Sequence, residues 1–106
     1  MLSVTTDFLP GRTIETSLGI ARGSVVRARF IGRDFIAGLR KLVGGEVNEY
    51  TTLLAESREQ ALERMLLHAQ SLGADAVINV RFTSNTIMEG TAEMLAYGTA
   101  VTLAPA

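Results

Sequence analysis

Apolar and polar residues alternate along the first third of the chain. The alternation predicts one strand over 13–20 and a second over 24–31, each with an apolar face turned to the core. The residues between them, 21–23, end in glycine and predict a turn that joins the two strands into a hairpin. Before the first strand, Pro10 and Gly11 fit the central positions of a type II turn.

The spacing of the apolar residues then changes to that of amphipathic helices. It predicts a short helix over 34–43, and the glycine pair at 44–45 is typical of a helix stop. A longer helix is predicted over 49–72, with Asn48 as its N-cap and Gly73 as the residue at which it ends. Two helices therefore follow the first pair of strands.

Strand patterns return in the last third, over 76–87 and 91–103, with a turn at 88–90 between them. Strict alternation in the first of these strands puts four residues on one face, Ala76, Ile78, Val80 and Phe82. Neither face of the last strand is strongly polar, so we expect one face to pack on the helices and the other on more sheet or on a second subunit. The order of elements predicts a single α+β domain over 1–106, built as a hairpin, two helices and a hairpin.

Composition removes several function classes. The chain has 106 residues, with ten Lys and Arg against eleven Asp and Glu, so it lacks the basic surface that nucleic-acid binding needs. It has one His and no Cys, and the absence of Cys excludes thiolate catalysis and Cys-based metal sites. No apolar run is long enough to span a membrane, and the N-terminus does not resemble a secretion signal. We expect a cytoplasmic protein without nucleic-acid or membrane partners.

Three arginines form the first candidate site. Arg27 and Arg29 share a face of the predicted strand and Arg33 follows closely, so the three could hold an anion together with backbone donors of the short helix. The alternative is that they pair with Glu15 or another acid across strands.

The one histidine, His68, is the centre of the second candidate site. It lies close to the apolar stripe of the long helix, where a histidine usually packs and finds a local hydrogen bond. In a closed oligomer, symmetry would bring several copies of the imidazole together, with Glu46 and Glu49 as carboxylate neighbours. Such an assembled site would take a divalent metal ion as its cofactor.

Four segments in this order resemble the YbjQ-like family of small bacterial and archaeal proteins. They are 33–45 (RDFIAGLRKLVGG), Tyr50, 72–77 (LGADAV) and 96–101 (AYGTAV). The resemblance covers nearly the whole chain and implies an α+β subunit with a curved antiparallel sheet, assembled into a ring-shaped homopentamer. It brings no established catalytic residues. It also implies that Arg33, Asp34 and Tyr50, in the most distinctive stretch of the family, belong to any site its members share.

The family is often labelled as heavy-metal-binding, but soft heavy metals prefer thiolates and this chain has no Cys. The function predicted from the sequence is a non-enzymatic, homo-oligomeric binding protein, with a metal ion or small ligand at its subunit boundaries. Two alternatives stay open. One is a structural ring without a ligand, and the other is an enzyme completed between subunits, with Asp34, Tyr50 or His68 as acid–base groups.

Overall fold

The computed structural model describes residues 1–28, 48–88 and 91–105, with the backbone alone for residues 28 and 48–53. In chain order the elements are β1 (Leu2–Ser3), β2 (Ile14–Ala28), α2 (Asn48–Ser71), β3 (Ala76–Met88) and β4 (Thr91–Leu103). The predicted helix over 34–43 and its glycine stop lie outside the described residues. Within the described ranges, no helix is long and apolar enough to cross a membrane.

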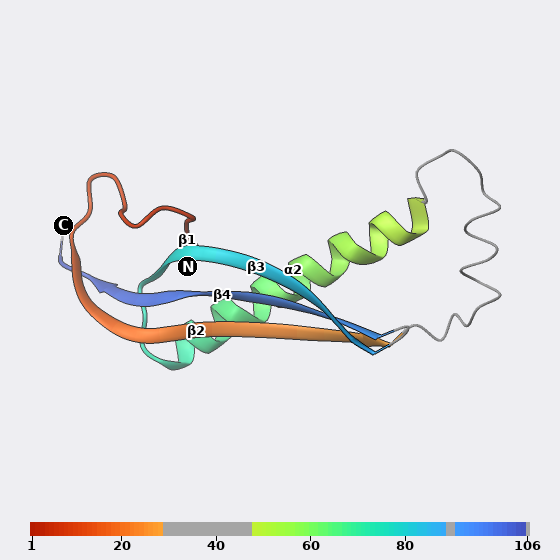
Figure 1. Cartoon of the computed structure of the whole chain (residues 1–106). Coiled ribbons are helices and arrows are strands. Elements are labelled where there is room, and N and C mark those ends of the chain that lie inside the picture. The colour runs from red at the N-terminus through yellow and green to blue at the C-terminus, as the bar shows by residue number, and fades with distance from the viewer. Residues whose placement is uncertain (29–47, 89–90, 106) are drawn as a thin grey trace, which may run out of the picture.

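The four strands form one open sheet in the order β1-β3-β4-β2 (Figure 1). β4 lies in the middle and is antiparallel to both of its long neighbours, as the predicted C-terminal hairpin requires for β3. β1 runs parallel to β3, with Leu2 opposite Ala76, so the sheet is mixed and the prediction of a purely antiparallel sheet is wrong. Figure 1 shows α2 crossing behind the strands, so the described part has one helix on one face of the sheet.

The predicted hairpin over 13–31 is also wrong, because β2 runs without a turn from Ile14 to Ala28. Gly23, expected in the turn, lies in the strand at the point where α2 comes closest. A Cβ on Gly23 would collide with backbone atoms of Met65 and Ala61. The glycine therefore provides space for the helix instead of a change in chain direction.

Two features predicted from the sequence are observed, the turn before β2 and the end of α2 at Gly73. Gly11 has a φ of 76° and the Arg12 N–H donates to the Leu9 carbonyl at 3.0 Å, which closes the predicted turn. α2 ends before Gly73, whose φ of 84° is the left-handed conformation of a helix stop. The Ala74 N–H then donates to the Ala69 carbonyl at 3.1 Å.

A β-bulge at Asn79 changes which side chains of β3 face the helix. Ile78 pairs with Thr99, but the next pair joins Arg81 to Tyr97, so β3 uses one more residue than β4 over this interval. Asn79 takes a φ of 54° to do so. Val80 thus joins the helix-facing side, and the predicted common face of Ala76, Ile78, Val80 and Phe82 is wrong beyond the bulge.

Two apolar clusters lie on opposite faces of the sheet. The larger cluster lies between α2 and the sheet and consists of Ala21, Val25, Ala61, Met65, Ala69, Val77, Val80, Met94, Ala96 and Ala100. The smaller cluster lies under the chain that precedes β2 and consists of Leu9, Ala76, Ile78 and Val101, with Val4, Ile14 and Leu103 beside them. The N-terminal segment therefore covers only one end of the face opposite α2.

Candidate functional site

Arg27 lies near the end of β2, on the side of the sheet that α2 covers. Its neighbour on β4 is Ala92, and its Nη2 donates a hydrogen bond to Oε1 of Gln60 on α2 at 2.8 Å. The Nε–H of the same guanidinium is buried and has no hydrogen-bond partner among the described residues. In the described part of the chain, no other buried side-chain nitrogen or oxygen lacks a hydrogen-bond partner.

A small cavity lies beside Arg27, between α2 and the sheet. Leu54 and Ser57 line it from the helix, and Ala92 and Met94 line it from β4. Its volume is about 20 Å³, which is room for one water-sized group. In Figure 1 the helix moves away from the strands toward its N-terminal end, the end from which Leu54 and Ser57 come.

Of the three predicted anion-binding arginines, Arg27 alone lies in the described ranges. Arg29 and Arg33 lie outside them, as does Asp34, so their grouping stays a prediction. In the alternative, the arginines pair with Glu15 or another acid. Glu15 is excluded for Arg27 because it lies near the opposite end of the same strand, and the hydrogen-bond partner of Arg27 among the described residues is the neutral Gln60 amide.

Tyr50 and Glu49 lie in the first turn of α2, where the backbone alone is described. Glu46 lies outside the described residues. The proposed grouping of Glu46, Glu49 and His68 therefore stays a prediction. Among the described residues, no group of three or more His, Cys, Asp or Glu side chains is placed to hold a metal ion.

His68 binds the outer edge of β2. Its Nδ1 accepts a hydrogen bond from the Arg22 backbone N–H at 3.0 Å, and the ring is half-buried. One turn earlier on α2, the Arg64 Nη1 donates to the Ser24 carbonyl at 2.7 Å. Because Nδ1 accepts this hydrogen bond, the ring proton belongs on Nε2, and neither nitrogen of His68 has a free lone pair for a metal ion. The described residues therefore do not fit a heavy-metal site.

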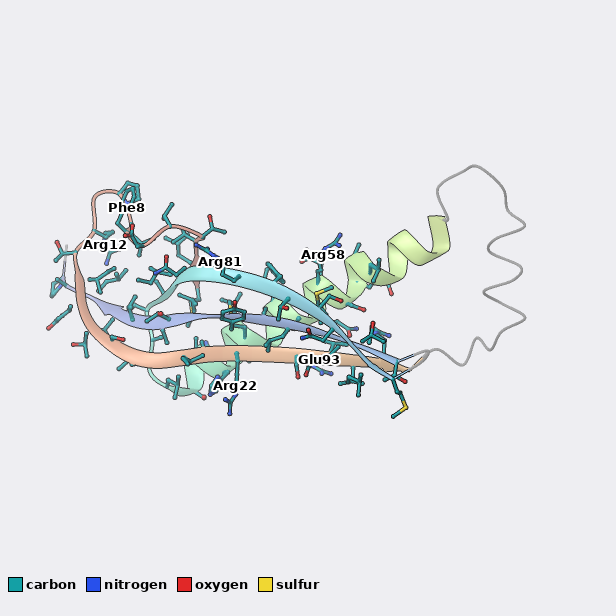
Figure 2. All side chains as sticks on the ribbon, in the orientation of Figure 1. Phe8, Arg12, Arg22, Arg58, Arg81 and Glu93 are labelled. Carbon is teal, nitrogen blue, oxygen red and sulfur yellow. The ribbon has the colours of Figure 1, made fainter. Side chains whose placement is uncertain are left out.

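The sheet face opposite α2 stays open beyond the N-terminal segment. Ile20 and Val26 have exposed fractions of 66% and 54%, and Tyr97 one of 37%. Tyr97 lies between two arginines, Arg22 on β2 and Arg81 on β3. Figure 2 shows Arg22 projecting from the sheet into solvent, whereas the Arg81 Nη1 donates to the Thr5 carbonyl at 2.9 Å.

Two residues beside the cavity were not predicted. Ser57 is 3% exposed, and it lies four residues before the buried Ala61, so a polar residue at a core position of the helix was visible in the spacing. Gln60 has no such signal, because it is an exposed glutamine whose role depends on the position of β2.

The described structure defines a class of small α+β protein with one long helix on an open four-stranded sheet. A family model described as "Putative heavy-metal-binding" matches residues 1–104, and the chain belongs to this YbjQ family. It is 52% identical to a UPF0145 protein of Methanosarcina acetivorans over 95% of each chain. It is 54% identical to a UPF0145 protein of Thermococcus kodakarensis, over 95% of this chain and 89% of the relative.

A solved structure shares the fold at much lower identity. It is a protein of unknown function of the DUF74 family from Pediococcus pentosaceus, with a TM-score of 0.62 and 16% sequence identity over 98% of each chain. At this identity the likeness concerns the fold alone. The family assignment made from the sequence is confirmed by the family model and by the relatives.

Proposed function

We propose that this chain is a cytoplasmic binding protein, not an enzyme, that assembles into a homo-oligomer and holds a small ligand near its subunit boundaries. The observation that supports it best is the open part of the sheet. Ile20, Val26 and Tyr97 expose apolar surface on the face opposite α2. Large apolar side chains exposed on one face of a sheet are typical of an interface. A second copy of the chain is the proposed partner.

The edges of the sheet support the same proposal. β2 is the outer strand over its whole length, and β1 with the residues that follow it covers the edge of β3 only as far as Val80. Edge strands carry unpaired N–H and C=O groups that accept a strand of another chain. His68 and Arg64 occupy the β2 edge at Arg22 and Ser24, so added strands would pair on either side of these residues. The resemblance to YbjQ-like proteins makes a ring of five the proposed number.

A small molecule suits the described residues better than a metal ion. The acidic and histidine side chains in the described ranges do not gather, whereas the cavity beside Arg27 offers a cation with an unused donor. Arg27 lies close to the end of β2, the strand at the outer edge of the sheet. A ligand bound there would lie near the boundary between the proposed subunits.

Native mass spectrometry of the untagged protein, purified gently from its expression host, tests the proposal. One spectrum reports both the number of subunits and any retained mass, and the absence of a histidine tag avoids adventitious metal. We expect a closed oligomer that carries a reproducible extra mass. A monomer at micromolar concentration would overturn the proposed assembly. An oligomer without extra mass, before and after incubation with cell extract metabolites, would overturn the binding function in favour of a structural ring.

A further inference from the structure

We propose that the cavity beside Arg27 binds an anionic oxygen group, the carboxylate or phosphate of a small molecule. The inference names the ligand class of the proposed binding function and rests on that function for its role. The cavity itself lies within one chain, between α2 and the sheet, so it can be tested whether or not subunits assemble.

The first step of the argument is the charge of Arg27. A guanidinium keeps its positive charge at any physiological pH, and its one polar side-chain partner in the described structure is the neutral amide of Gln60. An amide oxygen accepts a hydrogen bond but does not neutralise the charge. Among the described residues its positive charge therefore has no hydrogen-bonded anionic partner, which favours an anion over a water molecule or a cation.

The second step is the geometry of the donors. Nη2 is bonded to Gln60 at 2.8 Å, while the buried Nε–H next to it has no partner among the described residues. A carboxylate or phosphate oxygen accepts a short, charge-assisted hydrogen bond from such an N–H, so an oxygen anion is the ligand that this free donor matches best.

The third step is the size of the cavity and its lining. The volume of about 20 Å³ holds one oxygen-sized group, so the remainder of the ligand has to extend out of the cavity. Leu54 and Met94 supply apolar walls, which strengthen a charge-assisted hydrogen bond by excluding water. Ser57 adds a buried hydroxyl to the same lining.

One acid also lines the cavity, Glu93 of β4. Its two neighbours in the strand, Ala92 and Met94, line the cavity from the face of the sheet that α2 covers. Alternation along a strand directs the Glu93 carboxylate to the opposite face of the sheet. Its charge is then separated from Arg27 by the sheet.

Isothermal titration calorimetry on the full chain at constant ionic strength tests the inference, with acetate, inorganic phosphate and chloride as separate probes. We expect saturable binding of one oxyanion per chain and no comparable heat with chloride. The arm with the tighter binding, acetate or phosphate, identifies the ligand as a carboxylate or a phosphate compound. Arg27→Gln should weaken binding at least tenfold. The matched charge control Arg22→Gln, on the same strand but in solvent, should change it less than twofold.

Ala92→Leu provides a second variant, which fills the cavity and keeps the charge of Arg27. It should also weaken binding at least tenfold, and it decides the question if Arg27→Gln does not fold. Absence of saturable oxyanion binding to the wild type would overturn the inference, as would equal losses in Arg22→Gln and Arg27→Gln. An assembled protein without oxyanion binding would overturn this inference alone. A monomer that binds oxyanions through Arg27 would instead overturn the proposed assembly.

Discussion

The two faces of the sheet are completed in different ways. On the helix face, Ala61, Met65 and Ala69 of α2 are fully buried against β2 and β4. The small residues on both elements let the helix backbone come close to the strands, as at Gly23. On this face, the helix of the same chain therefore buries the apolar side chains of the sheet.

The opposite face is covered at one end only, by the chain that precedes β2. Leu9 packs over Ile78 and Val101 in a small cluster, but beyond it the side chains of Ile20 and Val26 are exposed on the same face. The apolar side chains of Ile20 and Val26 lie on this part together with polar ones such as Arg22, and no described element covers them. The difference indicates that the helix face determines the stability of the fold and that the open face is available for partners.

Gly23→Ala should have the largest effect, because the added Cβ would meet the backbone of α2, which can respond only by moving the helix. We expect a loss of about 3 kcal/mol in the free energy of unfolding, measured by denaturant titration at fixed protein concentration. Ser24→Ala, one residue further along β2, is the control and should change it by less than about 0.5 kcal/mol. A mild effect at Gly23 would contradict the close contact of helix and strand.

Ile20→Ser should have an intermediate effect, on assembly and not on the fold. Loss of an apolar side chain from the open face should raise the dissociation constant of the oligomer about tenfold, or about 1.4 kcal/mol. The unfolding free energy of the dissociated chain should change by less than about 0.5 kcal/mol. Analytical ultracentrifugation over a dilution series measures the first quantity.

Leu67→Ser is the matched control for that experiment, since Leu67 is 58% exposed on α2, away from the sheet. It should leave the dissociation constant unchanged. If Leu67→Ser dissociated the oligomer and Ile20→Ser did not, the interface would lie on the helix and the role given to the open face would be wrong.

His68→Ala should have the smallest effect. It removes the acceptor of the Arg22 N–H at the edge of β2 and should cost about 1 kcal/mol of unfolding free energy. His68→Asn keeps an acceptor on a short side chain and should recover part of that loss. Equal losses in the two variants would show that the ring packing of His68, and not its hydrogen bond, stabilises the edge.

Local patterns predicted most elements within a residue or two. The helix expected over 49–72 is observed as Asn48–Ser71, and the strand expected over 91–103 is observed as Thr91–Leu103. Both depend on signals that operate within a few residues, such as helical spacing, Gly73 as a stop and alternation. The pairing of Leu2–Ser3 with β3 was not predicted, because a two-residue strand has no periodicity to detect.

The errors come from residues whose role depends on distant parts of the chain. A glycine between two alternating runs is typical of a turn, and the real reason for Gly23 is visible only once α2 is placed against β2. Asn79 likewise gives no local sign that the strand will bulge and change faces. Arg27 was chosen as a candidate by its charge, but its Gln60 partner and the cavity depend on how helix and strand come together.

The strand order has a consequence for how the chain folds. β2 is the first long strand to be made, yet among the described residues its one partner strand is β4, which pairs Leu103 with Ile14. β3 and β4, by contrast, are neighbours in sequence and can form early. Contacts between residues far apart in sequence slow folding, because a long loop must close before they form. During synthesis β2 therefore has to wait for the final strand, and truncation before β4 would leave it without a sheet to join.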